Sequence, residues 1–280
     1  MTLLRPSKIG PLHLIPAGGS AEAKSLTERL GKFYDTTRNY TAFNEPFDQH
    51  IWLRLVADEI KFRNERMIRV LEVGAGCGSV LGESLGLDRS EIHYTAQDIT
   101  ATNVEQLRRK ADAVHIGPLK DLNRCFDLIF SLFVLEHVAV PGDFLIDIDH
   151  LLSPGGVHIV VCPRYDFPGY VCPSMRHHDG LRLLNWEMRR HASNTLAWCG
   201  TGEPGFWVNT DPALFHKTWH RDADAVHIVS QASLTRWHVK MGYRVRRLHP
   251  RISGAVDFLI KRLATTSLAF DKSPAAKIRQ

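Results

Sequence analysis

Three glycines at alternate positions are the most distinctive chemical feature of the sequence. The short apolar run 68–73 leads directly into the turn 74–78, whose sequence is GAGCG. A strand followed by a glycine-rich turn and a helix is how a doubly wound sheet binds a nucleotide-containing ligand, because backbone without Cβ atoms can approach the ligand and adopt positive φ. The spacing G-x-G-x-G differs from the G-x-G-x-x-G of dinucleotide sites. The turn therefore predicts a ligand site with little sign of a pyrophosphate.

Two carboxylates flank this turn in the predicted sheet. Glu72 lies two residues before the first glycine, and Asp98 ends the next apolar run along the chain. A carboxylate at the carboxyl end of a neighbouring strand is well placed to accept hydrogen bonds from both hydroxyls of a ribose. The residues therefore predict a ligand that contains a nucleoside. The alternatives are that Asp98 only starts the following helix and that Glu72 is purely structural.

Alternating strands and helices must position these groups. The sequence predicts strands over 68–73, 92–97, 113–117, 126–133 and 157–162, and helices over 79–87, 101–112 and 141–152. Thr100 is placed to cap the second of these helices. Five strands joined by four crossovers indicate a doubly wound, mostly parallel α/β sheet of Rossmann-like type.

The rest of the chain surrounds this core. We expect an irregular arm over 1–22, helices over 23–35 and 49–63, a helix over 180–196 and a final helix and strand over 230–241 and 243–248, with either a strand or a helix over 254–263. These predictions divide the chain into five segments. They are an N-terminal arm and helical lid (1–66), the cofactor-binding core (67–163), an insertion after strand five (164–226), the completion of the core (227–263) and a flexible tail (264–280). A stretch as long as 164–226, rich in tryptophan and histidine, is normally functional.

Composition limits the alternatives. The chain has 280 residues, of which 44% are hydrophobic and 23% charged, an ordinary globular composition. No apolar run approaches the roughly 20 residues that span a bilayer, and the proline-broken start does not resemble a signal peptide. Five cysteines without a C-x-x-C pair indicate reduced thiols and no structural zinc. We therefore expect a cytoplasmic protein without a membrane segment.

The net charge of +5 is concentrated near the C-terminal end. Arginines and lysines recur over 244–279, where they would either attract phosphate-bearing substrates and nucleic acid or form a solvated surface. The solvated surface is the simpler interpretation, so a nucleic-acid partner is not expected.

The core resembles the class I S-adenosylmethionine-dependent methyltransferases. Four segments show the resemblance in the order of that family, namely VLEVGAGCG at 70–78, YTAQDIT at 94–100, FDLIFSLFVLEHV at 126–138 and FLIDIDHLLSPGGVHIVV at 144–161. Together they cover most of 65–163. A weaker fifth segment, 225–245, is similar to the final helix–strand unit of members that have an insertion after strand five.

The resemblance implies that S-adenosylmethionine is the cofactor and assigns its contacts. The turn around Cys77 would line the methionine half through Gly74, Ala75, Gly76 and Gly78, with Glu72 orienting the loop. Asp98 would hold the ribose, Ile99 would lie on the adenine, and Ser131, Leu132 and Phe133 would border the sulfonium. The acid that the family often has near the adenine amine is missing or displaced to Asp121, so Leu119 is the adenine contact expected there. Tyr34 would either cover the cofactor as part of an N-terminal lid or pack in the core.

Methyl transfer is an in-line displacement, which holding the two reactants in line accelerates and which a general base assists when the acceptor is a hydroxyl. Glu136 and His137 follow strand four, at the rim where the methyl group should point. His137 has an ordinary pKa near neutrality and is the candidate base, with a purely structural role as the alternative. We also include His227 among the candidate catalytic residues, because the histidines after 177 could contact the acceptor.

A metal-dependent variant is the less favoured possibility. Small-RNA 2′-O-methyltransferases and a ubiquinone-pathway O-methyltransferase resemble the loop around Glu136, but they place a further Glu where this chain has Phe133. His227, or His216 and His220, could replace that ligand, yet we expect no bound metal. The function predicted is methylation, on oxygen, of a small-molecule or sugar-containing acceptor. The rivals are an RNA-modifying methyltransferase and a non-catalytic cofactor-binding protein, and the sequence indicates no particular oligomeric state.

Overall fold

A seven-stranded sheet forms the centre of the protein. The computed structural model describes residues 7–16, 18–36, 49–63, 67–199, 205–216, 220, 222–251, 254, 261 and 263–274. Within these residues the strand order is β5-β4-β3-β6-β7-β10-β9. The strands are β3 (Ile68–Val73), β4 (Ile92–Asp98), β5 (Ala113–Ile116), β6 (Phe126–Leu132), β7 (Leu152–Pro163), β9 (Arg244–Arg247) and β10 (Thr265–Asp271).

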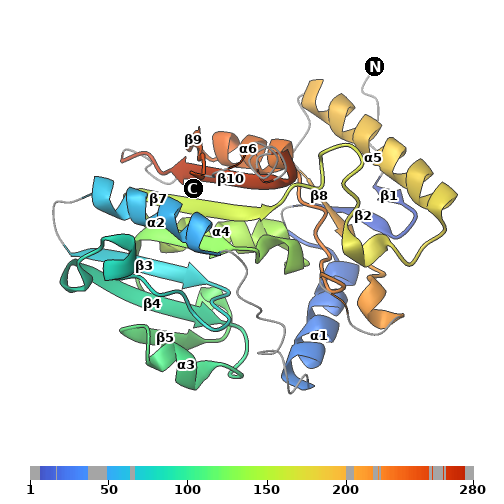
Figure 1. The fold of residues 1–280 in the computed structure, drawn as a ribbon. Helices are drawn as coiled ribbons and strands as arrows, with labels where there is room; N and C mark the ends of the chain where they lie inside the picture. The colour runs from blue at the N-terminus through green and yellow to red at the C-terminus, as the bar shows by residue number, and fades with distance from the viewer. Residues whose placement is uncertain are drawn as a thin grey trace.

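The sheet is parallel from β5 to β7, and β10 runs antiparallel to both β7 and β9. This arrangement confirms the predicted doubly wound α/β fold. Parallel strands place their carboxyl ends at one edge, and in Figure 1 the arrowheads of β3, β4 and β7 point toward α1 (Ala21–Thr36). The glycine turn after β3 therefore lies at the edge of the sheet that faces the N-terminal helix.

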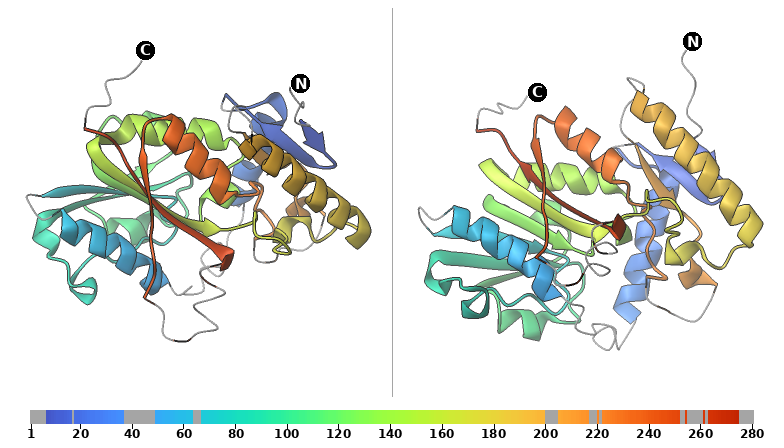
Figure 2. Two further views of the ribbon diagram at one scale, coloured as in Figure 1. Left: turned by 90° about the horizontal axis from the view of Figure 1, so that it is seen from above. Right: turned by 45° about the horizontal axis from the view of Figure 1, so that its top comes forward.

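Helices cover both faces of the sheet. Because side chains alternate along a strand, Val70 and Leu71 enter different apolar clusters. The cluster around Val70 includes buried side chains of α2 (Gln49–Phe62), whereas the cluster around Leu71 includes those of α4 (Pro141–Leu151) and α6 (Gln231–Lys240). Figure 1 and Figure 2 show α2 on one side of the sheet and α4 and α6 on the other.

The prediction of an irregular N-terminal arm is wrong for two short stretches that form strands. The arm forms β1 (Lys8–Ile9) and β2 (Leu12–Ile15), and β2 pairs antiparallel with β8 (Phe206–Asn209) of the insertion. The sequence contains little signal for these strands, because they are short and lie among prolines and glycines, and β8, the partner of β2, is far away along the chain. The arm and the insertion thus share one small sheet, next to the insertion helix α5 (Gly180–Cys199) in Figure 2.

The predicted flexible tail is also wrong over 265–271, which form the buried strand β10. The predicted helix 79–87 is reduced to a 3₁₀ turn, η2 (Glu83–Leu85), because Gly82 is extended and Gly86 is left-handed. The predicted helix 101–112 contracts to α3 (Val104–Arg108), which Asn103 rather than Thr100 precedes. Most of the uncertain segment 254–263 lies outside the described residues.

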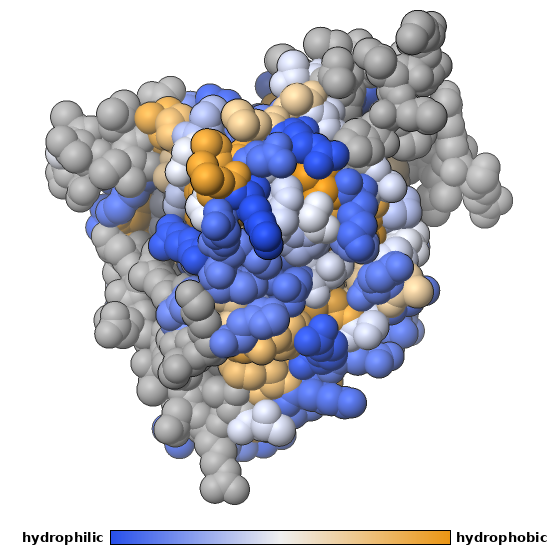
Figure 3. All heavy atoms as spheres, turned by 90° about the vertical axis from the view of Figure 1, so that its right-hand side faces the viewer, coloured by the Kyte–Doolittle hydropathy of each residue, from blue (hydrophilic) through white to orange (hydrophobic). Residues whose placement is uncertain are grey.

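The surface shows mixed polarity. Figure 3 views the face that carries α5, where hydrophilic side chains surround separate apolar patches. Leu181, Leu184 and Met188 of α5 are among the exposed apolar side chains of the molecule. None of the helices in the described part of the chain is long and apolar enough to cross a membrane.

The buried position of β10 gives a test of the fold. Phe270 is fully buried and stacks on His238 with ring centroids 3.4 Å apart. Replacing a buried Phe by Ala removes its transfer free energy and leaves a cavity, so Phe270→Ala should lower the free energy of unfolding by about 3–5 kcal/mol. The matched control is Phe62→Ala, because Phe62 is 86% exposed, and denaturant unfolding measures both. Equal stability of the two variants would contradict the placement of β10.

Candidate functional site

The glycine turn adopts the backbone conformation that its sequence predicts. Gly74, Gly76 and Gly78 have φ values of 62°, 54° and 76°, a region that side chains with Cβ rarely adopt. The turn closes through the hydrogen bond from Gly78 N to Ala75 O, at 2.7 Å. Lys110 stabilises the end of the turn, because its ammonium group donates hydrogen bonds to the carbonyls of Cys77 and Gly78 at 2.6 and 2.8 Å.

Close packing is a second reason for glycine in this turn. A Cβ atom on Gly74 would lie 2.6 Å from the side chain of Val134, and one on Gly78 would lie 2.8 Å from Leu107. Val134 begins the loop that contains Glu136 and His137. The turn after β3 and the loop after β6 are therefore in direct contact at the carboxyl edge of the sheet.

Glu72 holds the end of the turn in place. Its buried carboxylate accepts hydrogen bonds from the backbone N of Ser79 at 2.9 Å, from the Ser79 hydroxyl at 2.6 Å and from the hydroxyl of Tyr94. Burial raises the pKa of Glu72, and the hydrogen bonds from Ser79 and Tyr94 oppose that shift. These contacts describe a residue that orients the loop, and Ser79, Tyr94 and Lys110 are partners that the sequence analysis did not identify.

Asp98 joins the ends of β3 and β4. One of its carboxylate oxygens accepts from Gly76 N at 2.8 Å, and the other accepts from Thr100 N at 3.0 Å. Burial raises the pKa of Asp98, while these backbone hydrogen bonds favour the charged form. The second oxygen also accepts from the Thr100 hydroxyl at 3.4 Å, whereas the oxygen bonded to Gly76 N keeps a lone pair that can accept from a ligand hydroxyl. Gln97 supports the same turn by accepting from Gly74 N through its side-chain oxygen at 3.2 Å.

The other expected cofactor contacts differ in their exposure. Ile99 is 57% exposed beside Asp98, so its side chain is accessible to a ligand, whereas Leu119 is 5% exposed and belongs to the core. Ser131 and Leu132 are buried at the end of β6, and the Ser131 hydroxyl has no hydrogen-bond partner among the described residues. Phe133 has a positive φ of 57°.

A buried polar cluster lies directly beyond Phe133. His137 Nδ1 is 3.1 Å from Asp224 Oδ2, an ion-pair contact without the alignment of a full hydrogen bond. The hydroxyl of Tyr34 donates to the same Asp224 oxygen at 2.6 Å. Glu136 is 1% exposed, and its Oε2 atom has no hydrogen-bond partner in the part of the chain described. The structure thus brings Tyr34, Glu136 and His137 together through Asp224, which the sequence analysis missed.

The charges in this cluster are strongly coupled. Burial alone would lower the pKa of His137, but the neighbouring Asp224 and Glu136 carboxyl groups raise it to about 10. Burial raises the pKa of Glu136 to about 8, against the opposing effect of His137. Burial would also raise the pKa of Asp224, yet the charge of His137 and the hydrogen bond from Tyr34 hold it below its usual range. Asp224 therefore favours the charged form of the His137 imidazole, whereas burial favours the protonated form of the Glu136 carboxyl group.

His227 lies next to this cluster but differs in charge. Its ring is buried, Nδ1 lies 3.1 Å from Leu135 O, and burial lowers its pKa to about 4. Its backbone N donates to Glu136 O at 2.8 Å. His227 is therefore neutral near pH 7 and is linked to the main chain of Glu136.

Among the described residues of the insertion, His216 and Trp207 have partners within the insertion itself. His216 lies 2.5 Å from Asp211 on the insertion, Trp207 is buried and donates to Asn194 at 2.9 Å, and Trp219 is outside the described residues. No signal in the sequence pairs Asp224 with His137, because the two residues lie 87 positions apart on segments without a shared motif.

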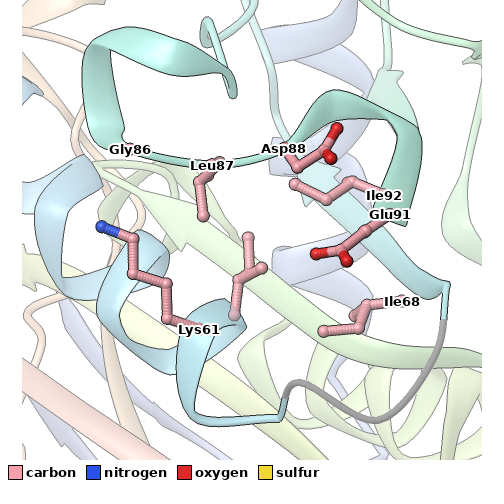
Figure 4. Close-up of a pocket in the computed structure, with 8 residues that line it drawn as sticks. Lys61, Ile68, Gly86, Leu87, Asp88, Glu91 and Ile92 are labelled. Carbon is pink, nitrogen blue, oxygen red and sulfur yellow. The ribbon is translucent and has the colours of Figure 1, made fainter.

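A cavity of about 250 Å³ lies at the opposite edge of the sheet. Figure 4 shows Ile68 and Ile92, the first residues of β3 and β4, among its lining, with Lys61, Asp88 and Glu91 around it. Since the glycine turn follows the last residue of β3, this cavity is separate from the predicted cofactor site.

The residues at the carboxyl edge fit the cofactor that the sequence resemblance implies. The turn presents backbone without Cβ atoms at three positions, Asp98 offers lone pairs for ribose hydroxyls, and Ile99 offers an exposed apolar surface for a flat base. The unpartnered Glu136 carboxyl group lies in the loop that touches Gly74 through Val134. The donor set therefore suits a nucleoside that carries a positively charged group.

Comparison with known proteins supports the same interpretation. A family model described as a methyltransferase domain matches residues 45–248. A highly reducing polyketide synthase of Strobilurus tenacellus is 26% identical over 57% of this chain and 6% of its own length. A ubiquinone biosynthesis O-methyltransferase of Maricaulis maris is 31% identical over 33% of this chain and 39% of its own. The chain therefore matches well under half of the length of these two curated relatives.

Solved structures share the fold. The 1,6-didemethyltoxoflavin-N1-methyltransferase of Burkholderia thailandensis was solved with bound 1,6-didemethyltoxoflavin and S-adenosylhomocysteine. It superposes with a TM-score of 0.52 at 14% identity, over 94% of this chain and 95% of that one. At this identity the similarity concerns the fold. Because the family model covers most of the sequence and coincides with the sheet and its glycine turn, this chain belongs to the methyltransferase-domain family.

Proposed function

We propose that this chain transfers the methyl group of S-adenosylmethionine to an oxygen atom of a small-molecule or sugar-containing acceptor. The observation that supports the proposal best is the buried Glu136–His137–Asp224 cluster, which lies on the loop in contact with the glycine turn. A turn for the cofactor and a proton-accepting group beside it are the two parts that methylation of a hydroxyl requires.

The cofactor-binding half of the proposal rests on the turn after β3. Gly74, Gly76 and Gly78 would lie along the methionine half, and Asp98 would hold the ribose while it keeps its hydrogen bond to Gly76 N. Glu72 holds the end of the turn in place by accepting a hydrogen bond from Ser79 N. When bound, S-adenosylmethionine supplies a methyl carbon attached to a positively charged sulfur.

The acceptor half rests on His137. An imidazolium cannot accept a proton, so His137 must be neutral when the acceptor hydroxyl reacts. A positive charge close to His137 disfavours the imidazolium, because like charges repel. Cofactor binding should therefore lower the pKa of His137 and prepare it as the base. Asp224 then holds the ring in position and stabilises the proton after transfer, while Tyr34 fixes Asp224.

The proposed segments have distinct roles. Residues 67–163 bind the cofactor, and β9 and β10 complete the sheet. The arm in 1–66 and the insertion 164–226 build the side that receives the acceptor, which their shared sheet of β1, β2 and β8 supports. A small acceptor is favoured over nucleic acid, because the half-buried Arg246 of the basic C-terminal region is already paired with Asp271 and Glu59. The Maricaulis relative, named an O-methyltransferase, agrees with an oxygen acceptor.

Turnover tests the reaction directly. The purified protein should transfer a tritium-labelled methyl group from S-adenosylmethionine to a component of a small-molecule extract, and the product should be stable to treatments that cleave esters. His137→Ala should abolish this transfer while it still binds S-adenosylhomocysteine. Labelling of bulk RNA instead, or binding without any transfer across a broad panel of hydroxylated acceptors, would contradict the proposal.

Binding tests the cofactor site without an acceptor. Asp98→Ala removes the ribose partner and the anchor of Gly76 N, and hydrogen bonds to charged groups contribute about 1.5–3 kcal/mol, so the Kd for S-adenosylhomocysteine should rise about 10- to 100-fold. Isothermal titration calorimetry measures it. The matched control is Asp88→Ala at the opposite edge of the sheet, which should bind like the wild type. Unchanged affinity in folded Asp98→Ala would refute this site.

The charge state of His137 gives an independent test. NMR titration of the histidine ring protons, with His137 assigned through His137→Gln, should show a pKa well above 7 in the ligand-free protein. The sulfonium should then make the pKa lower by about 1–2 in the S-adenosylmethionine complex than in the uncharged S-adenosylhomocysteine complex. In Asp224→Asn the pKa should fall toward the ordinary value of about 6.5.

The control in this experiment is the exposed His150 on α4, whose ring-proton chemical shifts should be the same in the two complexes. An equal His137 pKa in both complexes would place this residue away from the reacting methyl group and would remove it as the base.

A further inference from the structure

A second polar cluster lies in the insertion, outside the candidate active site. His177 and His178 follow the 3₁₀ turn η6 (Pro173–Met175), Asp211 follows β8, and His216 ends the 3₁₀ turn η7 (Ala213–Phe215). One donor atom from each of His177, His178 and Asp211 lies within 4.8 Å of the other two. His216 Nε2 lies 2.5 Å from Asp211 Oδ1, so the fourth residue joins the same group.

The orientation of the rings is set by their neighbours. His177 Nδ1 lies 3.0 Å from the carbonyl oxygen of Ser174, which can only accept, so Nδ1 carries the proton and a neutral ring has its lone pair on Nε2. That Nε2 atom faces Asp211 Oδ2 at 3.9 Å, which is longer than a hydrogen bond. A backbone carbonyl that fixes the tautomer in this way is typical of histidines that bind metal through the other nitrogen.

His178 adds a nitrogen that has no other explanation. Its Nε2 atom is buried and has no hydrogen-bond partner among the described residues. The ring lies edge-on to Trp186 at 4.9 Å and beside the His177 ring at 3.8 Å between centroids, and the His216 ring stacks on His177 at 4.7 Å. Three imidazoles packed this closely would repel one another if they were protonated.

The charges of these side chains influence one another. Burial, followed by the charge of His177, lowers the pKa of His178 and favours its neutral form. Burial alone would raise the pKa of Asp211, but His216 and the other two histidines lower it. Metal ligands must be deprotonated, so binding of an ion here would release the proton that His216 shares with Asp211.

We propose that His177, His178, Asp211 and His216 form a binding site for one divalent transition-metal ion. Imidazole nitrogens with one carboxylate suit Zn²⁺, whose tetrahedral sites have metal–ligand distances of about 2.0–2.2 Å and hence donors about 3.4 Å apart. The separations in the structure are within small side-chain rotations of that value. The sequence predicts no metal around Glu136, and no sequence pattern brings Asp211 next to His177 and His178.

An ion at this position would tie together the segments that surround the active site. Between Asp211 and His216, Leu214 N donates to Ala223 O at 3.1 Å, and Ala223 precedes Asp224. Thr210 N donates to Pro11 O at 3.0 Å, which connects the same loop to the N-terminal arm. The ion would therefore hold the segment that presents Asp224 to His137, without touching the acceptor or the cofactor turn.

Metal binding itself is the test, and it does not depend on the methyl-transfer proposal. Chelator-treated protein should bind one Zn²⁺ per chain by calorimetry with a Kd of about 1 µM or tighter, and Co²⁺ should produce the visible absorption of a low-coordinate site. Binding should weaken at least 100-fold in His178→Ala and at least 10-fold in Asp211→Asn, which preserves the size of the side chain. His150→Ala, on the exposed side of α4, is the control that should bind like the wild type.

Thermal unfolding provides a second test of the metal site in case His178→Ala folds poorly. A ligand that binds only the folded state raises the melting temperature, so Zn²⁺ should raise it in the wild type and His150→Ala but not in Asp211→Asn. Absence of stoichiometric binding in the wild type would overturn the site. Equal Zn²⁺ affinity of the wild type and Asp211→Asn would also overturn it, because the ion would then lie elsewhere on the chain.

Discussion

The buried carboxylate of Asp224 is the interaction on which the active-site side of the molecule depends. A charge removed from water is costly unless it is paired and hydrogen-bonded, and Asp224 meets that requirement with His137 and Tyr34. These two partners come from the loop after β6 and from the N-terminal helix α1. Three segments that are far apart in the sequence therefore pack together around one carboxylate at the carboxyl edge of the sheet.

The parts of the fold that could be predicted are those with a local signal. Ile68–Val73 is an apolar run bounded by a glycine turn, and the structure places β3 over those residues. The strand β10 could not be predicted in this way. Its sequence, TTSLAFD, is short and mixes polar with apolar residues, and its burial depends on pairing with β7, more than a hundred residues earlier. The arm strand β2 was missed for the same reason, since its partner β8 lies in the insertion.

The residues of the candidate site also fall into those with a local sequence signal and those without one. Glu72, Asp98 and the glycines occur at fixed spacing within one strand–turn–strand unit, so sequence alone could propose them. The partners Ser79, Tyr94 and Lys110, which hold the turn, are ordinary residue types with no distinguishing spacing. Likewise, His137 could be proposed from its place after β6, whereas its coupling to Asp224 required the tertiary structure. Asp211 shows the same limit beside His177 and His178 in the insertion.

The position of β10 also has a consequence for how the protein folds during synthesis. β9 pairs with β10 and not with β7, so β9 cannot join the sheet before residues 265–271 have left the ribosome. Until then, β7 presents an open edge with unpaired backbone groups, which is where chains associate wrongly. The nascent protein can therefore assemble its parallel strands early but closes the sheet late, and molecular chaperones that shield strand edges would act on this interval.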